Sequence, residues 1–567
     1  MAAMPRPEII TLQGRNQSLV WEVVDGGAPL WRYWGPRLGD RAEVPAHGKR
    51  TSPSFSLDED VPLSIFPTFG VGWYGQTALL AHRAGTDFAQ SVTRCAWERD
   101  GQTIRFILTD DVAHIEARLS FALDPASDVL TLSTSLTNTG DAPLEVHWLA
   151  AATLPLPADA ASVLSYSGRH SAEFQEQVEP LGSSLWRREN RYGITSHADF
   201  PGALVLMPGS TDHGGTVYGA QLAWSGNSAQ TIDTPDEGLR LWQLGAWLAP
   251  GEIILAPGET LETPQLLATC STTGRDGIAR NFHASIRTRA TWPGGKMRPR
   301  PVILNTWEGF YFNHDLSALK ELADAAAAVG IERFVLDDGW FSGRDDDTKA
   351  LGDWWPDHQK FRDGLGPLID HVTSKGMEFG LWVEPEMVNP DSDLFRAHPD
   401  WALRIAGRPL LTARNQLVLD MTNREVSDHI FASLDALLRA HQIAYLKWDH
   451  NRYLTTAGRP DGRACYQAQV HAVYALIDRL RAEHSQVEIE SCAGGGGRID
   501  AGILSRTHRV WVSDNIDPLS RLPMHDSYLQ FFPPEMMGAH VGATPSHCTG
   551  SSQHIDFRAA VALPGHF

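Results

Sequence analysis

The sequence contains little cysteine, and its five cysteines are far apart and form no CxxC pair: Cys95, Cys270, Cys465, Cys492 and Cys548. An odd, scattered set excludes a disulfide framework and a zinc knuckle, and it is typical of a reducing compartment. No apolar run is long enough to span a bilayer. Residues 1–17 lack the basic and apolar regions of a signal peptide. We therefore expect a cytoplasmic protein.

Positive charge is scarce relative to negative charge. The 567 residues include 48 Lys and Arg against 68 Asp and Glu, which gives a net charge of −20. Such a surface repels phosphate backbones and anionic lipids, so we expect neither a nucleic-acid nor a membrane partner. Tryptophan, by contrast, is abundant, with 19 residues. Most of these are expected in the core, and some suit the apolar face of a sugar.

The first half of the chain has the pattern of antiparallel β structure. Leu119, Phe121 and Leu123 alternate with polar residues, and the segment "VLTLSTSLTNTG" continues this alternation into a turn. We find no helical period of convincing length here. The sequence therefore predicts a large β-sandwich over residues 1–290, followed by a Pro/Gly-rich, basic linker at 291–301.

Strands and helices alternate in the second half, over residues 302–567, which predicts a parallel sheet. The expected strands lie in "PVILNTW", "RFVLDDGW", "EFGLWVEPEMV", "IAYLKWD", "VEIESC", "HRVWVSD" and "MGAHVGAT". An open doubly wound sheet and a closed (β/α)8 barrel both fit this alternation. A Gly-rich phosphate loop is missing after the first strand, which weakens the case for dinucleotide binding.

Polar and aromatic residues recur where these strands end, and this favours the barrel because its strand C-termini converge on one mouth. The residues are Trp307, Asp337, Asp338, Trp382, Glu384, Lys447, Asp449, Cys492 and Asp514. We expect Glu384 and the nearby Glu386 to brace the rim rather than to catalyse. Seven strands are recognisable, and the chain ends where an eighth should begin. We therefore expect a barrel truncated before its last strand, with two open edges.

Asp449 is the first candidate catalytic residue. Lys447 lies two positions earlier on the same side of the strand, and Asn451 and Arg452 follow. A nearby cation and hydrogen-bond donors keep a carboxylate ionised, as a nucleophile must be. Helix capping is the structural alternative for such an aspartate. His450 points to the opposite face of the strand, so it forms a poor metal chelate with Asp449.

Glycoside hydrolysis needs a second carboxyl group that stays protonated until it delivers its proton. Asp514 ends another apolar strand and is the candidate. We expect partial burial and the neighbouring acid Asp517 to raise the pKa of Asp514. Asp517 is itself a rival candidate, although it lies past the strand end and suits capping or orientation.

At these residues the sequence resembles glycoside hydrolase family 36, the bacterial α-galactosidases. The resemblance covers most of the chain and is densest from 303 to 540. It rests on six motifs in order: "LNTWEGFYF", "FVLDDGWF", "GLWVEPEMV", "KWDHNR", "SCAGGGGR" and "VWVSDNID". The resemblance implies an N-terminal β-supersandwich, a (β/α)8 barrel and a C-terminal β domain, of which the last is expected to be missing here.

The resemblance also implies roles for individual residues. Asp449 is the expected nucleophile and Asp514 the expected acid/base of a retaining mechanism. Asp337 and Asp338 match the acids that hold the galactose 4- and 6-hydroxyls. The remaining expected substrate-binding residues are Trp307, Trp382, Arg414, Lys447, Asn451, Cys492 and Gly494. Trp307 and Trp382 could instead simply pack at the rim, Cys492 could be a small wall residue, and the glycines from 494 could be only a turn.

The sequence departs from the family in an N-terminal loop that can reach a neighbouring subunit's active site in relatives. This chain has "FGVGWYGQTAL" there, so the loop itself supports neither the assembly nor the aglycone preference of the relatives. We expect a homo-oligomer, for example a tetramer in a full-length chain, from the other motifs. We expect an α-galactosidase acting on α-1,6-linked galactosides such as melibiose and raffinose, without cofactor or metal. Open alternatives are an α-N-acetylgalactosaminidase, a galactosyl transferase, a metal-dependent hydrolase and an inactive sugar-binding fragment.

Overall fold

The computed structural model describes residues 8–39, 54–55, 57–236 and 239–567. Residues 1–7, which begin the segment without a signal-peptide pattern, therefore lie outside the described residues. All five cysteines are free thiols. Across the described ranges, every helix is too short or too polar to cross a membrane. The chain forms two compact units, and each is described separately: residues 1–167, 176–191 and 199–287 form the first, and residues 168–175, 192–198 and 288–567 form the second.

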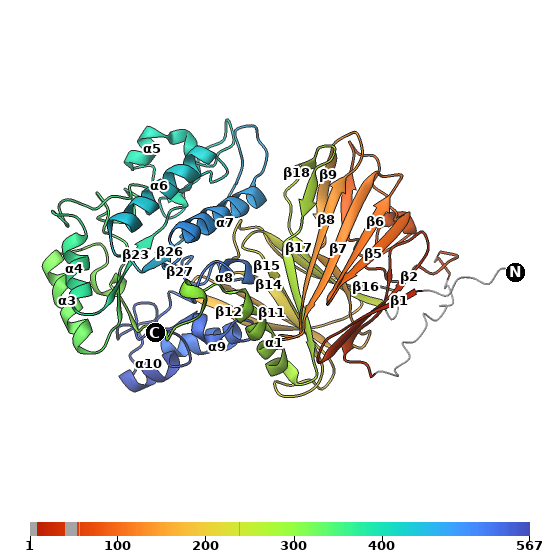
Figure 1. The fold of residues 1–567 in the computed structure, drawn as a ribbon, viewed down its shortest axis with the longest axis horizontal. Helices are drawn as coiled ribbons and strands as arrows, with labels where there is room; N and C mark the ends of the chain where they lie inside the picture. The colour runs from red at the N-terminus through yellow and green to blue at the C-terminus, as the bar shows by residue number, and fades with distance from the viewer. Residues whose placement is uncertain (1–7, 40–53, 56, 237–238) are drawn as a thin grey trace. The chain divides into compact units, whose positions relative to one another are not determined.

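The first unit consists almost entirely of strands, which Figure 1 draws in red to yellow-green. Its largest sheet has the order β12-β11-β14-β15-β20-β8-β7-β6-β5, with β19 pairing with β8. The bounds in this sheet are β5 Arg94–Asp100, β6 Thr103–Asp110, β7 Ile115–Asp124, β8 Val129–Asn138, β11 Ser162–Arg169, β12 Ala172–Pro180, β14 Asp199–Leu206, β15 Val217–Ala223, β19 Thr260–Glu262 and β20 Gln265–Ser271.

Three smaller sheets complete the first unit, with the orders β1-β2-β3, β10-β17-β16-β13 and β18-β9-β4. Their bounds are β1 Glu8–Gln13, β2 Gln17–Val23, β3 Leu30–Pro36, β4 Leu79–His82, β9 Leu144–Leu149, β10 Ala152–Pro155, β13 Trp186–Asn190, β16 Ser228–Asp236, β17 Leu239–Ala246 and β18 Ile253–Leu255. A short 3-10 helix, η1, spans Phe69–Val71.

The predicted alternation is confirmed in β7 and β8, which pair antiparallel. Leu119 and Phe121 are buried, whereas Ser120 between them is more exposed. The prediction that residues 1–290 lack a helix is wrong, because α1 spans Gly274–Arg289. Ile278, Phe282 and Ile286 bury one face at helical spacing. This period is weak in the sequence because glycine, asparagine and serine fill the rest of the buried face.

The second unit contains a seven-stranded parallel sheet surrounded by helices, which confirms all seven expected strands. The strands are β21 Ile303–Asn305, β22 Arg333–Leu336, β23 Glu378–Val383, β26 Tyr445–Trp448, β27 Glu488–Ser491, β28 Arg509–Trp511 and β29 Met537–Gly538. A separate hairpin pairs β24 Met387–Val388 with β25 Leu417–Val418. The helices are α2 Trp307–Phe310, α3 Leu316–Ala328, α4 Gly366–Ser374, α5 Asp393–Ala397, α6 Arg424–Ala440, α7 Tyr466–Glu483, α8 Ala501–Leu504, α9 Pro518–Leu529 and α10 Ile555–Ala562, with 3-10 turns η2 Pro293–Gly295, η3 Pro399–Trp401 and η4 Pro534–Met536.

The strand order distinguishes between the two folds that the sequence allowed. The strands follow one another in chain order, β21-β22-β23-β26-β27-β28-β29, and neighbouring strands are parallel. A doubly wound sheet reverses its order at a switch point, and this sheet has no reversal. Helices α3, α4, α6 and α7 lie outside β23, β26 and β27 in Figure 1. The arrangement therefore excludes the open doubly wound alternative.

The last two residues link the two outer strands of this sheet, which corrects the expected pair of open edges. The His566 N–H donates to Met537 O over 2.8 Å, and the Ala539 N–H donates to His566 O over 2.9 Å. On the other side, the Ile303 N–H donates to Phe567 O over 3.1 Å. His566 and Phe567 therefore occupy the position of an eighth strand between β29 and β21.

A buried ion network lies at the N-terminal ends of the strands. Arg333, the first residue of β22, donates from its NH1 group to Glu488 Oε2 over 2.9 Å and from its NH2 group to Glu378 Oε2 over 2.6 Å. Arg300 also reaches Glu488 Oε2, at 3.0 Å. Burial alone would raise the pKa of Glu488, but these two arginines lower it to about 2.

We predict that Arg333→Met lowers the free energy of unfolding by up to about 3 kcal/mol, because it removes the buried cation shared by Glu378 and Glu488 and leaves Arg298 and Arg300 to pair with them. The folded-state pKa of Glu488 is below its unfolded value, so the ion-pair stability is present above about pH 4.3 and is lost as the pH falls toward 2. Urea unfolding of wild type and variant at several pH values measures both effects. Arg424→Met, at a side chain that is 92% exposed, is the control and should leave the midpoint unchanged. Equal midpoints for the two variants would contradict the prediction.

Candidate active site

A cavity of about 910 Å³ lies within the second unit and is lined by residues along the parallel strands as well as by residues that follow them. Every predicted site residue except Cys492 lines it: Trp307, Asp337, Asp338, Trp382, Arg414, Lys447, Asp449, Asn451, Gly494 and Asp514. Cys492 is buried next to the lining residue Ala493, and its backbone N–H bonds to Trp448 O. Burial raises the pKa of the Cys492 thiol far above its ordinary value, so it stays a neutral thiol.

Asp449 follows β26 directly and accepts four hydrogen bonds. Its Oδ2 accepts from Trp382 Nε1 at 3.0 Å and from Asn451 Nδ2 at 2.8 Å. Its Oδ1 accepts from the backbone N–H of His450 at 2.8 Å and of Gly494 at 3.3 Å. These donors occupy most of the lone pairs of a buried carboxylate, and they fix its orientation toward the cavity.

The charge of Asp449 is stabilised against its burial. Burial and the nearby Asp514 would raise its pKa, but Lys447 and the donors on Asn451 and His450 lower it overall. Burial and the charge of Asp449 raise the pKa of the neighbouring Glu384 to about 8, even though Arg414 opposes this. Glu384 is therefore neutral at pH 7 and places no second negative charge beside Asp449.

Asp337 and Asp338, which follow β22, differ in their partners. Asp337 Oδ2 accepts from Lys447 Nζ at 2.8 Å and from Asn305 Nδ2 at 2.6 Å. Asp338 forms a two-point pair with Arg344, at 3.0 and 2.8 Å. Lys447 thus links the Asp337 carboxylate to the strand that positions Asp449. Burial would lower the pKa of Lys447, but the charges of Asp337 and Asp449 raise it overall.

Asp514 lies just after β28 and is more accessible than Asp449, with a side chain that is 37% exposed. Its Oδ2 lies 3.0 Å from His170 Nε2, and its Oδ1 accepts from Trp511 Nε1 at 3.0 Å. Burial would raise the pKa of Asp514, but the His170 hydrogen bond and the charges of Lys447 and Arg414 lower it. The expectation of a raised pKa for Asp514 is therefore wrong, because its hydrogen-bonded neighbour is a histidine rather than the acid Asp517.

Asp517, the rival candidate, caps a helix instead. Its side chain accepts from the Leu519 N–H at the start of α9, and it also binds the hydroxyls of Thr549 and Ser551. Asp517 does not belong to the cavity lining. The capping interpretation is therefore confirmed for Asp517.

Glu386 braces the rim, as expected. It accepts from Trp448 Nε1 at 2.8 Å, pairs with Arg498 at 2.8 Å and lies 3.1 Å from His450 Nδ1. His450 therefore does point away from Asp449, toward the opposite side of the strand. Glu384 accepts from the Asn451 N–H at 2.5 Å and from Gln416 Nε2 at 3.2 Å.

The glycines after Cys492 allow close backbone packing, so they are more than a turn. A Cβ on Gly496 would lie 2.3 Å from Val512 O, and one on Gly495 would lie 2.7 Å from the backbone N of Asp514. Gly494 has a positive φ of 51° and lines the cavity, and a Cβ there would contact His170 Cδ2 at 3.6 Å and Asn451 Oδ1 at 3.7 Å. The loop therefore brings the ends of β27 and β28 together beside both catalytic candidates.

The aromatic and arginine candidates have distinct environments. Trp382 is 2% exposed and lies parallel to Phe341, with ring centroids 6.3 Å apart. Because its indole N–H binds Asp449, it is more than rim packing. Trp307 begins α2 and packs edge-on against Tyr311 and Phe312. Arg414 has a side chain that is 36% exposed, 3.6 Å from Asp347.

Four histidines of the cavity lining, His170, His197, His540 and His547, were missed in the sequence, and the first two contact predicted site residues. His170 lies in the tip between β11 and β12, and His197 lies in segment 192–198; both belong to the second unit. His197 Nε2 is 2.8 Å from Gly494 O, and its Nδ1 is 2.5 Å from the Tyr453 hydroxyl. A histidine in a short turn carries no periodic signal, so only the folded chain brings His170 to Asp514.

Comparison with known proteins gives a consistent match. The Melibiase family model matches residues 260–567, and the glycosyl hydrolase family 36 N-terminal domain model matches residues 27–256. An α-galactosidase of Escherichia coli is 43% identical over 99% of this chain and 77% of its own length. The α-galactosidase AgaA of Geobacillus stearothermophilus is 34% identical over 83% of this chain and 65% of its own length.

Crystal structures of AgaA variants are also similar. One in complex with stachyose has a TM-score of 0.94 and 30% identity, and one in complex with raffinose has a TM-score of 0.91 and 30% identity. Each match covers 99% of this chain and 82% of the AgaA chain. From the matched family models, the sequence identity and the shared fold, we conclude that the chain belongs to the α-galactosidases of glycoside hydrolase family 36.

Proposed function

We propose that this α-galactosidase removes terminal α-1,6-linked galactose from oligosaccharides by double displacement with retention. The observation that carries the proposal is the pair Asp449 and Asp514, which line one cavity from the ends of β26 and β28. One carboxylate is buried and held ionised by four donors, and the other is accessible and bound to an imidazole. This difference suits a nucleophile and an acid/base.

In the first step, the Asp449 carboxylate attacks the anomeric carbon while Asp514 gives its proton to the departing oxygen. The C–O bond to the aglycone breaks, and a galactosyl ester forms on Asp449. In the second step, Asp514 takes a proton from water, which attacks the same carbon and releases Asp449. Two inversions give net retention.

The lowered pKa of Asp514 favours the base form that the second step requires. The first step needs the acid form, and a bound sugar favours it because it displaces water from a carboxyl group whose side chain is 37% exposed. His170, whose pKa is raised by its hydrogen bond to Asp514, remains beside the group in both steps.

We further propose that Asp337 and Asp338 select galactose through its 4- and 6-hydroxyls. A charged acceptor in the right place can bind the axial 4-hydroxyl of galactose. The equatorial 4-hydroxyl of the epimer points in another direction and is out of its reach. Lys447 would bind sugar hydroxyls beside Asp449, and Asn451, Trp382 and the loop at Cys492 and Gly494 would enclose the ring. Arg414 and Trp307 would contact the outer part of the substrate, in line with the stachyose and raffinose complexes of AgaA.

The finer architecture is also proposed. The second unit would be a (β/α)8 barrel, preceded by a β-supersandwich at 1–290 and a linker at 291–301. Five free cysteines support a cytoplasmic location. A homo-oligomer is supported by exposed aromatic residues in and near the N-terminal loop, where Tyr74 is 70% and Phe88 62% exposed.

We predict that Asp449→Ala and Asp514→Ala each abolish hydrolysis of melibiose and respond differently to azide. With an activated aryl α-galactoside, azide should rescue Asp449→Ala as the β-galactosyl azide, because azide replaces the nucleophile in a single inversion. Asp514→Ala should give the α-azide after two inversions. NMR of the products measures the anomer, and the opposite anomers would contradict the assignment. An aryl α-N-acetylgalactosaminide in parallel tests the alternative substrate.

We predict that Trp382→Phe moves the acidic limb of the kcat/KM profile upward by about 1–2 pH units, because a hydrogen bond to a charged group contributes about 1.5–3 kcal/mol. Asp449 must be ionised, and loss of the indole donor raises its pKa. Trp354→Phe is the matched control, because Trp354 packs against Trp382 and its buried Nε1 has no hydrogen-bond partner within the described chain. A shift of equal size in both variants would attribute the effect to packing and contradict the prediction.

A further inference from the structure

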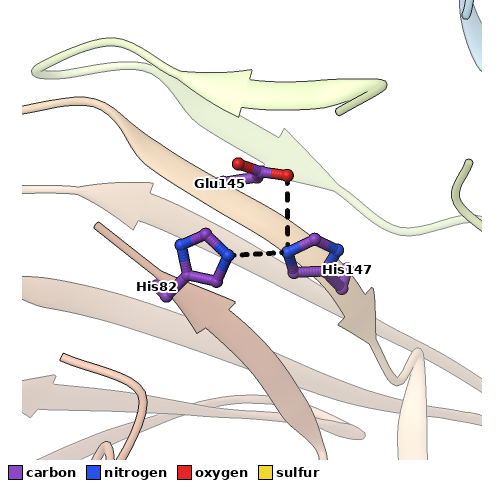
Figure 2. A group of neighbouring side chains, drawn as sticks. All are labelled: His82, Glu145 and His147. Carbon is purple, nitrogen blue, oxygen red and sulfur yellow. Dashed lines mark hydrogen bonds and ion pairs between the residues drawn. The ribbon is translucent and has the colours of Figure 1, made fainter. Parts of the chain in front are cut away.

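Two histidines and a glutamate of the first unit lie on one face of a small sheet, and none of them belongs to the cavity lining. His82 ends β4, and Glu145 and His147 lie on β9, the middle strand of the sheet β18-β9-β4. Glu145 and His147 are two residues apart, so both point to the same face, and His82 is the cross-strand partner of Glu145. Figure 2 shows the three side chains turned toward one another.

The distances approach those of a metal coordination sphere. His82 Nε2 and His147 Nε2 are 3.0 Å apart, and His147 Nε2 lies 3.4 Å from Glu145 Oε1. In a tetrahedral site with bonds of 2.0–2.1 Å, neighbouring donor atoms are about 3.3 Å apart. One donor atom from each residue lies within 4.8 Å of the other two. Small side-chain rotations would therefore bring all three around one ion.

Among the described residues, no lysine or arginine forms an ion pair with Glu145 that would neutralise its charge in place of a metal ion. Within that part of the chain, the ion pair of Glu145 is with His147. The side chains of His147 and Glu145 are 36% and 31% exposed, so solvent and ions can enter. The competing arrangement is a simple hydrogen bond in which one Nε2–H donates to the other ring.

The tautomer of His82 decides between the two arrangements. The Gly85 N–H approaches His82 Nδ1 at 3.2 Å, which places the ring proton on Nε2 in the ion-free state. Binding an ion through Nε2 moves this proton to Nδ1 and breaks the contact with Gly85. That contact is long and exposed, so it opposes the change only weakly.

We propose that His82, Glu145 and His147 bind a divalent transition-metal ion, with Zn²⁺ the best match, and that water completes the coordination. Two imidazoles and one carboxylate suit Zn²⁺, whereas Ca²⁺ and Mg²⁺ prefer sets of oxygen ligands. The ion would tie β4 to β9. β4 has only four residues, a single neighbour in its sheet and a register shift between Leu80 and Ala81, so it gains most from a second link.

The test compares Zn²⁺ binding to the chelator-treated full chain by calorimetry across matched variants. Glu145→Gln keeps the shape of the side chain and removes its charge, and His82→Gln and His147→Gln remove one imidazole each. Loss of one ligand should weaken binding at least about 10–100-fold, since even indirect partners of a ligand have that effect. His213→Gln is the control, because His213 is an exposed histidine of the same unit that pairs with a single acid, Asp276.

Two further readouts separate this site from others. Zn²⁺ should raise the thermal unfolding midpoint of wild type and of the His213→Gln control only. Co²⁺ should give d–d absorption without a thiolate charge-transfer band, which excludes Cys95 as the ligand. Equal Zn²⁺ affinity in wild type and Glu145→Gln, or a thiolate band, would overturn the proposal. Loss of galactoside hydrolysis on chelation would place the ion in the catalytic cavity and would overturn it as well.

Discussion

Keeping one buried carboxylate charged is the constraint on which the rest of the candidate site depends. Asp449 is 6% exposed, and an isolated charge in such a place would be neutralised. Donors from the strand β23, the segment after β26 and the glycine loop surround it. Lys447 supplies positive charge, and the protonated Glu384 withholds negative charge. The hydrogen-bond donors, Lys447 and the neutral Glu384 thus all favour the charged form of the Asp449 carboxylate.

The two ends of the parallel sheet serve different purposes. At the C-terminal ends Asp337, Asp449 and Asp514 line a cavity, and their hydrogen-bond partners fix their orientation there. At the N-terminal ends the charges of Arg333, Glu378 and Glu488 satisfy one another in the interior. His566 and Phe567 complete the backbone hydrogen bonding between the outer strands. The buried ion pairs thus lie at one end of the strands and the candidate site residues at the other.

Much of the second unit could be predicted because each strand is a short apolar run that stops at a polar residue. The same pattern located Asp449, since Lys447 and Asn451 accompany it in the sequence. Contacts between distant residues could not be predicted. Asp514 meets His170, 344 positions away, whereas its sequence neighbour Asp517 turns aside to cap α9.

Weak local patterns account for the other differences between sequence and structure. α1 was missed because its buried face includes Gly277, Asn281 and Ser285 beside the apolar residues. The cluster of His82 and His147 was missed because 65 positions separate the two histidines. The two causes differ: the helix has a weak local apolar period, whereas the two histidines become neighbours only after strands far apart in the sequence have paired.

The position of His170 has a consequence for how this enzyme can be divided. A fragment that began at residue 288 would contain Asp337, Asp449 and Asp514 and most of the second unit. It would nevertheless lack the imidazole that sets the proton affinity of Asp514, because that imidazole is encoded more than a hundred codons upstream. Exchange of the N-terminal half for one that lacks this histidine would therefore change the pKa of Asp514 while leaving Asp337, Asp449 and Asp514 in place.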